Sequence, residues 1–329
     1  MKAIAYTRYG RPEELQLVEI DRPEPRDGQV LVRVHAAGVN SWDWDLLRGR
    51  PFVVRLGRGV IRPRQQHRVL GADVAGQVVA VGRNVSRYCV GDQVFGDLCD
   101  SGWGAFAEYV CAPEAALTPK PPTLSYQAAA AVPQAAVMAL QAIADYGKVQ
   151  PGSRVLFNGA GGGIGTFAVQ LAKHAGAEVT AVDRAEKLAM LSSLGVDHTV
   201  DCRRDDFTAN GLRYDLIVDV VASRSIQEYR RALRPGGRCV IIGGSIPRIL
   251  GMVLLQPLIA VTGDTSIRVL AHQPNKNLTN LAYMLVGGTI AAVVDRAYRL
   301  DQTAEALSLL GAGQVNGKVV ISIDHSAAA

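Results

Sequence analysis

The sequence predicts an α/β protein of two domains, a β-rich barrel-like domain and a domain with a doubly wound parallel sheet. Short strand-like segments punctuated by glycine and proline fill the first third of the chain, whereas strands and amphipathic helices alternate from Arg154 onward. A glycine-rich turn, NGAGGGIG at 158–165, joins the first strand and first helix of that second part. With 329 residues, of which 48% are hydrophobic, the chain is long enough for two cores.

The first third is predicted to form short strands, because its segments are rich in β-branched and aromatic residues and are bounded by turn residues. The expected strands are MKAIAYTRY (1–9), LQLVEI (15–20), QVLVRVHAAGV (29–39), VAGQVVAVG (74–82), DQVFG (92–96) and GAFAEYVCA (104–112). The proline cluster TPKPP at 118–122 then predicts a domain edge.

The rest of the chain is predicted to alternate between helices and buried strands. A helix is expected over 125–147, with Pro133 inside it, and the strands that follow are RVLFNG (154–159), EVTAVD (178–183), YDLIVDVV (214–221) and RCVIIGG (238–244). Between them lie the helices TFAVQLAKHAG (166–176), AEKLAMLSSLG (185–195) and SIQEYRRALRPGG (225–237). Such apolar strands imply a parallel sheet that is covered on both faces.

The C-terminal part is predicted to be shared between the domains. It consists of a helix at 277–288, a strand at 291–300, a helix at 302–313 and a strand at 317–323. We therefore expect residues 1–122 and 295–329 to form one domain and residues 123–294 to form the other.

Composition excludes several classes of protein. The N-terminus has no basic patch followed by an apolar run, so no signal peptide is predicted. The most apolar stretch, 249–262, contains Pro257 and is too short to span a membrane, which favours a buried or subunit-facing helix. The five cysteines form no C-x-x-C pair, which indicates a reducing compartment, namely the cytoplasm, without a disulfide framework.

The net charge of +5 is mild but unevenly spread. The stretch from Arg48 to Arg68 contains seven arginines and no acidic residue. A solvated loop is the favoured interpretation, and a site for a small anion or for nucleic acid is the alternative.

The glycine-rich turn predicts dinucleotide binding. Ala160, Gly162 and Gly165 match the G-x-G-x-x-G spacing between a strand and a helix, with alanine in the first position. The first position permits the tight turn, Gly162 lets the backbone approach a pyrophosphate, and Gly165 lets helix and strand pack closely. The N-terminus of the helix then supplies the positive end of its dipole to the phosphates.

The next strand ends at Asp183, 21 residues after Gly162. An acid there accepts hydrogen bonds from the ribose 2′-hydroxyl, which favours NADH. Arg184 and Lys187 follow, however, and both are able to meet the 2′-phosphate of NADPH; solvation at the surface is the alternative for each.

Seven segments run in order along the chain: GVNSWDWDLLRG (38–49), VLGADVAGQVVAVG (69–82), VGDQVFG (90–96), GAFAEYV (104–110), NGAGGGIGTFAVQLAK (158–173), DVVASRSIQEYRRALRPGGRCVIIGG (219–244) and GKVV (317–320). As an ordered set they resemble the medium-chain dehydrogenase/reductase superfamily, and within it the zinc-independent quinone oxidoreductase branch. The resemblance implies a chaperonin-10-like β domain, a Rossmann domain, a cleft between them, and assembly into a homodimer or homotetramer.

The resemblance also bears on metal chemistry. Superfamily members with catalytic zinc carry a cysteine after the third strand and later a Gly-His-Glu triplet. Here Asn40 takes the first position and Gly71-Ala72-Asp73 the second, and neither asparagine nor alanine replaces thiolate and imidazole at zinc. No zinc site is therefore predicted, and hydride is expected to go to an already activated acceptor.

Several site residues follow from the resemblance. Asn40 and Asp43 are the candidate catalytic residues. Asn40 is expected near nicotinamide and substrate, with a turn-capping role as the alternative. For Asp43 a structural hydrogen bond is favoured, and proton transfer is the alternative. Trp42 and Trp44 either wall the substrate pocket or fill the core. The expected cofactor-binding residues are Asn40, Met138 (in place of the threonine common in relatives), Ala160, Gly162, Gly163, Ile164, Gly165, Asp183, Arg184, Lys187, Ile242, Gly243, Gly244, Asn316 and Lys318. For Lys318, a surface position is the alternative.

The resulting prediction is a cytoplasmic NAD(P)H-dependent reductase of quinones or of activated C=C bonds, with NADPH favoured over NADH and without zinc or membrane attachment. The first alternative is an enoyl reductase dedicated to a biosynthetic, polyketide-like intermediate. The second is an RNA-binding or structural protein like the zeta-crystallin relatives, and it is disfavoured because no nucleic-acid-binding fold motif is present.

Overall fold

The computed structural model of the chain describes residues 1–244, 251 and 265–325. By their contacts the residues form two compact units. The first unit comprises Met1–Val137, Pro274–Gly288 and Ala292–Ala329; the second comprises Met138–Gln273 and Thr289–Ala291. Apart from residue 251, the apolar helix expected over 249–262 lies outside the described residues. No helix in the described part of the chain is long and apolar enough to cross a membrane.

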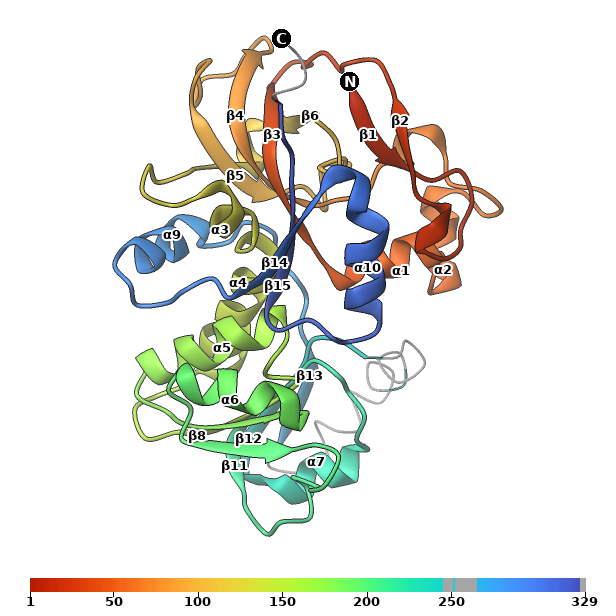
Figure 1. The fold of residues 1–329 in the computed structure, drawn as a ribbon. Helices are drawn as coiled ribbons and strands as arrows, with labels where there is room; N and C mark the ends of the chain where they lie inside the picture. The colour runs from red at the N-terminus through yellow and green to blue at the C-terminus, as the bar shows by residue number, and fades with distance from the viewer. Residues whose placement is uncertain (245–250, 252–264, 326–329) are drawn as a thin grey trace. The chain divides into compact units, whose positions relative to one another are not determined.

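The first unit is built on a largely antiparallel sheet. Its strands follow the order β14 (Val294–Arg299), β15 (Lys318–Ser322), β3 (Gln29–Val39), β4 (Asp73–Val81), β5 (Gln93–Asp97) and β7 (Thr118–Pro119), and β6 (Tyr109–Pro113) also pairs with β3. A separate hairpin joins β1 (Lys2–Ala5) and β2 (Gln16–Glu19). Figure 1 shows the blue β15 beside the red-orange β3, so a strand near the end of the chain completes this sheet.

Helices border the sheet of the first unit: α1 (Ser41–Arg48), α2 (Phe52–Arg58), α3 (Tyr126–Ala130), the start of α4 (Pro133–Leu140), α9 (Leu278–Val286) and α10 (Thr303–Gly311). The contacts of α3 place the unit boundary beyond the predicted edge at residue 122. A Cβ on Gly38 of β3 would lie 2.3 Å from the carbonyl oxygen of Ala130, so only glycine allows α3 to pack this closely on the sheet.

The arginine-rich stretch 48–68 is not a loop throughout, as the favoured interpretation expected, although many of its side chains are exposed to solvent. It holds α2 and the short 3-10 helix η2 (Gln65–His67). Three of its guanidinium groups lie over aromatic rings of the same unit: Arg48 over Trp44, Arg55 over Tyr9 and Arg58 over Trp103, at 5.0, 4.6 and 4.9 Å from the ring centroids. These cation–π contacts give those arginines a packing role.

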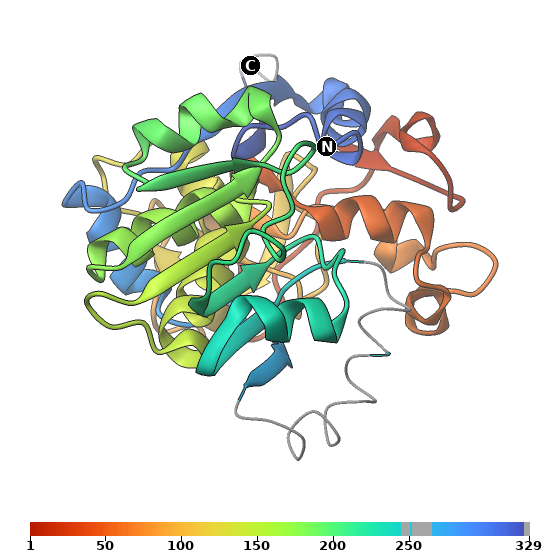
Figure 2. The same cartoon turned by 90° about the horizontal axis from the view of Figure 1, so that it is seen from below.

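The second unit contains six parallel strands within the described residues. Their order is β10 (His198–Asp201), β9 (Glu178–Asp183), β8 (Arg154–Asn158), β11 (Tyr214–Asp219), β12 (Leu233–Ile241) and β13 (Ser266–Val269). The connections between its strands include α5 (Gly163–His174), α6 (Ala185–Ser193) and α7 (Ile226–Ala232). Right-handed connections, which parallel strands favour, would put α5 and α6 on the opposite face from α7. Figure 2 shows helices on both faces of this sheet, which confirms the doubly wound fold.

Two predicted helices are interrupted where proline intervenes. The helix expected over 125–147 is divided into α3, α4 and a π-helical turn, η4 (Gln141–Gly147), and α4 begins at Pro133, whose missing N–H is tolerated only in a first turn. The helix expected to reach Gly237 ends at Ala232, because Pro235 disfavours helix at the residue before it. Strands β10 and β13 had no clear signal in the sequence.

Candidate functional site

The turn after β8 is shaped by Gly159 rather than by Ala160. Gly159 has a φ of +82°, and the N–H groups of both residues donate to the carbonyl oxygen of Val182, at 2.9 and 3.2 Å. A Cβ on Gly159 would lie 2.3 Å from Cγ2 of Val220. The tight-turn role predicted for Ala160 therefore belongs to the residue before it, where the left-handed backbone favours glycine.

Gly162 and Gly165 lie at the start of α5, and the space around them differs. Gly162 is the N-cap of α5, and a Cβ on it would meet only the carbonyl oxygen of Gly159, at 3.5 Å. A Cβ on Gly165 would lie 2.4 Å from the carbonyl oxygen of Ala160. The space beside Gly162 is thus open to a ligand, whereas Gly165 is required for packing.

The first turn of α5 offers unpaired donors. No described residue accepts a hydrogen bond from the N–H groups of Gly163, Ile164 or Gly165. A helix N-terminus with free N–H groups and an open glycine beside it favours phosphate oxygens. These residues therefore fit the pyrophosphate of a dinucleotide.

Asp183, at the end of β9, is buried and supports the turn. Its Oδ2 accepts from the N–H of Gly161 and its Oδ1 from the N–H of Arg184, both at 2.8 Å. The stem of Lys187 covers Gly161, since a Cβ there would lie 2.6 Å from Cδ of the lysine. Lys187 is 8% exposed, so the alternative of a solvated surface lysine is wrong for it.

The other predicted cofactor residues are spread over both units. Met138 lies on α4 and is buried in the core, and Ile242 donates its N–H to the carbonyl oxygen of Asp219 at the end of β12. Gly243 follows, and Gly244 has a φ of +122°. Asn316 belongs to the first unit, where its N–H donates to Asp295.

A buried polar cluster occupies the first unit, formed by Asn40 at the N-cap of α1, Asp43 on α1, Asp73 on β4 and Lys318 on β15. Asn40 donates from Nδ2 to Oδ2 of Asp73 at 3.0 Å and accepts at Oδ1 from Nζ of Lys318 at 2.5 Å. Lys318 also donates to the carbonyl oxygen of Val39 at 3.2 Å and forms an ion pair with Asp73 at 3.4 Å. With 2% of its side chain exposed, Lys318 is not the surface lysine that was the alternative.

Asp43 has a structural role in this cluster. Its Oδ2 accepts from the N–H of Asn40 and its Oδ1 from the N–H of Gly71, both at 2.8 Å. The first bond is the reciprocal half of a capping box at the start of α1. Both carboxylate oxygens thus hold backbone in place.

The two carboxyl groups of the cluster titrate near neutral pH. Burial away from water raises the pKa of Asp43 to about 7, against the opposing effect of its two backbone hydrogen bonds. Burial raises the pKa of Asp73 to about 6, with Lys318 opposing the shift and Asp97 adding to it. Burial therefore opposes ionisation of both carboxyl groups, and Lys318 offsets part of this effect at Asp73.

Sequence reasoning missed Asp73 and Gln134 as members of the cluster. Oδ1 of Asp73 accepts from the backbone N–H of Gln134 at 3.0 Å, and Nε2 of Gln134 is buried without a hydrogen-bond partner. The available signal was Asp73 itself, a lone acid in the apolar segment VLGADVAG. An unpaired charge in a buried strand is costly, so it indicates a partner.

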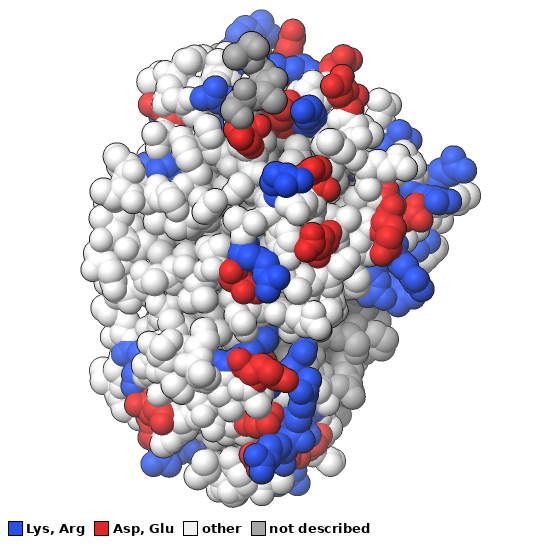
Figure 3. All heavy atoms as spheres, viewed as in Figure 1, with Lys and Arg blue, Asp and Glu red and all other residues white. Residues whose placement is uncertain are grey.

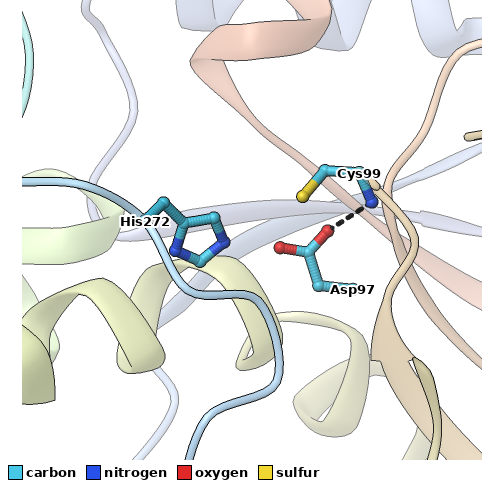
Figure 4. A group of neighbouring side chains, drawn as sticks. All are labelled: Asp97, Cys99 and His272. Atoms are coloured by element: carbon cyan, nitrogen blue, oxygen red, sulfur yellow. Dashed lines mark hydrogen bonds between the residues drawn. The ribbon is translucent and has the colours of Figure 1, made fainter. Parts of the chain in front are cut away.

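Other polar and aromatic candidates have local explanations. Trp44 packs against Gly311 of α10, where a Cβ would lie 2.5 Å from its ring, while Trp42 is 37% exposed. Figure 4 shows Asp97, the last residue of β5, and Cys99 just after that strand, with the N–H of Cys99 donating to the carboxylate at 2.8 Å. His272, also drawn there, belongs to the second unit, and within the first unit this pair alone provides no metal site.

Comparisons with known proteins give the family. Residues 26–122 match the alcohol dehydrogenase GroES-like domain, and residues 194–321 match a zinc-binding dehydrogenase family. A 2-methylene-furan-3-one reductase of Solanum lycopersicum is 30% identical over 98% of this chain and 79% of its own length. The chain belongs to the medium-chain dehydrogenase/reductase superfamily, in its zinc-independent quinone oxidoreductase branch.

Solved structures agree with this membership. The quinone oxidoreductase of Coxiella burnetii is 30% identical, with a TM-score of 0.87 over 98% of this chain and 99% of that one. The CurK enoyl reductase is 26% identical, with a TM-score of 0.83 over 98% and 99% of the two chains. The two-domain Rossmann-type fold predicted from the sequence is thereby confirmed.

Proposed function

We propose that this member of the superfamily uses NADPH to reduce quinones or carbonyl-activated C=C bonds. The observation that carries the proposal is the first turn of α5, where three backbone N–H groups that no described residue accepts from stand beside the open position at Gly162. A helix N-terminus that follows a glycine-rich turn is suited to the pyrophosphate of a dinucleotide. The quinone and enone reductases among its relatives support the choice of acceptor.

In the proposed reaction, residues of the chain bind the cofactor and orient the substrate. Gly163, Ile164 and Gly165 hold the pyrophosphate through their N–H groups, and Asp183 keeps the turn in shape. When bound, the reduced nicotinamide supplies the hydride. An N–H of Asn40 would donate to the carbonyl oxygen of the substrate, which gains negative charge during the reduction.

We propose that the reaction needs no zinc. Ala72 stands where zinc-dependent relatives carry histidine, and the side chain of Asn40 is already bonded to Asp73 and Lys318. Neither side chain supplies a thiolate or imidazole ligand. Turnover is therefore expected to persist in the presence of a metal chelator.

We propose that NADPH is the preferred cofactor, because Arg184 and Lys187 accompany Asp183 at the end of β9. Lys187 packs over Gly161 and Arg184 follows directly, which places positive charge beside Asp183. Asp183→Asn removes the negative charge and keeps an acceptor oxygen, so it is expected to tighten NADPH binding about tenfold and to weaken NADH binding. Isothermal titration with both cofactors measures this, and an unchanged NADPH affinity would contradict it.

We also propose a homodimer in the cytoplasm. The five cysteines are all unpaired, which fits a reducing compartment, and dimers are the most common assembly for soluble enzymes. Light scattering of the purified chain tests the assembly, and fractionation of the source cells tests the location.

The deciding experiment is a stopped-flow assay at 340 nm with chelator present. NADPH and NADH are each offered with 1,4-naphthoquinone and with a 2-enone. Oxidation of NADPH with either acceptor is the expected result. Tight NADPH binding without turnover of either acceptor would contradict the proposed acceptor class, and turnover of a 2-enoyl thioester alone would favour the biosynthetic enoyl reductase.

Nucleic-acid binding is not supported as a second function. On the face shown in Figure 3, basic and acidic side chains are interspersed, and three arginines of the 48–68 stretch are committed to aromatic rings. A nucleic-acid site would require a concentration of positive charge and would lose affinity steeply with salt.

A further inference from the structure

We infer that Asp73 and Lys318 are positioning residues that hold the carboxamide of Asn40 in one of its two flipped orientations. In that orientation, the second N–H of Nδ2 is presented to the carbonyl oxygen of the substrate. This inference rests on the proposed function, because it assigns the residues that prepare Asn40 for its part in the reaction.

The orientation follows from the chemistry of the two neighbours. An ammonium group only donates hydrogen bonds, so Lys318 selects Oδ1 of Asn40 as its partner, at 2.5 Å. An ionised carboxylate only accepts, so Asp73 selects Nδ2, at 3.0 Å. Rotating the amide by 180° would replace both attractive contacts with donor–donor and acceptor–acceptor contacts.

The two neighbours are themselves fixed. The carboxylate of Asp73 is held on its other oxygen by the N–H of Gln134 at 3.0 Å, so it is unable to rotate without losing a bond. Lys318 donates to Oδ1 of Asn40, to the carbonyl oxygen of Val39 and to Asp73, which uses all three of its N–H bonds. All of these side chains are buried, which limits competition from water.

This arrangement separates the roles of the three side chains. Because every N–H of Lys318 is committed inside the first unit, Lys318 has none left for a substrate or cofactor. Asn40 keeps one, since no described residue accepts from the second N–H of Nδ2. Asn40 is 6% exposed, so a ligand that displaces the little water there meets an oriented donor.

Kinetics of two cluster variants and one control variant test the inference. Asp73→Asn keeps the shape but lets either amide atom face Asn40, and Lys318→Met removes the ammonium at similar length. Each is expected to lower kcat about 10- to 100-fold with little change in the KM for NADPH, because misplaced groups lose this much. Asp27→Asn, at an exposed ion pair with Arg83, is the matched control.

A double-mutant cycle distinguishes positioning from general structural damage. In an Asn40→Ala background, adding Asp73→Asn is expected to lower kcat by less than about threefold, because its effect passes through the missing amide. An equal loss in both backgrounds would overturn the inference, as would wild-type kcat in Asp73→Asn and Lys318→Met.

A second readout needs neither cofactor nor turnover. In protein labelled with ¹⁵N-asparagine, the side-chain signals of Asn40 are assigned by their absence in Asn40→Ala. We expect one orientation with slow hydrogen exchange in the wild type, and faster exchange or two orientations in Asp73→Asn. Unchanged signals in Asp73→Asn would overturn the inference, whereas failure of the wild type to reduce any acceptor would overturn only the proposed function.

Discussion

At the scale of single residues, Gly162 and Gly165 lack side chains for different reasons. Gly165→Ala would force a Cβ to 2.4 Å from backbone, and we expect it to lower the free energy of unfolding by about 1–3 kcal/mol. Gly162→Ala meets only one atom, at 3.5 Å, so stability should stay within about 0.5 kcal/mol while NADPH affinity falls at least about tenfold. Urea unfolding and calorimetric titration measure the two effects.

A loss of stability in Gly162→Ala, or a loss of NADPH affinity alone in Gly165→Ala, would contradict these two roles. If Gly162→Ala bound NADPH as tightly as the wild type, the pyrophosphate would not approach that position. The wild-type chain in the same titration is the reference for both variants.

Asp43 predicts a pH dependence of stability. Burial raises its folded pKa to about 7, above the unfolded value, so between about pH 4 and 7 the folded state binds more protons. Its contribution to stability is therefore fully present at low pH and is lost as pH rises toward 7. The wild-type free energy of unfolding should fall relative to that of Asp43→Asn, by up to about 1.4 kcal/mol for each pH unit.

Urea unfolding of wild type and Asp43→Asn at a series of pH values measures this difference. The variant serves as the control for every other titrating group, including Asp73, whose pKa is raised in the same sense. A difference that stays constant from pH 4 to 7 would show that Asp43 is ionised in the fold.

At the scale of elements, the contact between β3 and α3 contains a histidine whose effect on stability changes with pH in the opposite direction to that of Asp43. His35 on β3 stacks on Tyr126 of α3, with ring centroids 4.3 Å apart, and its ring meets His325 at 5.4 Å. Burial, with His325 and Arg33 adding to it, lowers the pKa of His35 to about 4. Between about pH 4 and 6.5 the unfolded state therefore binds more protons than the folded state.

The stability that neutral His35 contributes is thus present above about pH 6.5 and is lost as pH falls toward 4. Relative to His35→Gln, the wild-type free energy of unfolding should decrease over that range. Thermal or urea unfolding at pH 7 and pH 4.5 checks it, and parallel behaviour of the two proteins would contradict it.

At the scale of the whole molecule, the two units have separate cores. One core is formed by residues such as Val32, Val74 and Ile321, and the other by residues such as Leu156, Ile217 and Tyr229. All three tryptophans of the chain, Trp42, Trp44 and Trp103, lie in the first unit. Tryptophan fluorescence therefore reports on one unit, whereas far-ultraviolet circular dichroism reports on both.

We expect saturating NADP⁺ to separate the two signals during urea unfolding. A ligand stabilises the part that binds it, by about 2.7 kcal/mol at a hundred times its dissociation constant. The predicted binding turn lies in the second unit, so the dichroism transition should shift to higher urea more than the fluorescence transition. Equal shifts of both signals would mean that the units unfold together.

The sequence by itself determined the second unit and its cofactor turn. The alternation of apolar strands with amphipathic helices, the spacing of Gly162 and Gly165, and Asp183 at a strand end are all properties of contiguous segments. Local conformation and short-range packing decide such features, so a linear pattern is sufficient to predict them. The family resemblance added Asn40 as a site residue, but not what holds it.

Only the tertiary structure decided what surrounds Asn40. Asp73 lies 33 positions away along the chain and Lys318 lies 278 away, and strand pairing brings both to the same amide. The same long-range pairing buries Lys318, which the sequence left open between surface and site. Burial and hydrogen-bond partners are properties of the packed chain, because they depend on residues whose distance in the sequence carries no signal of their contact.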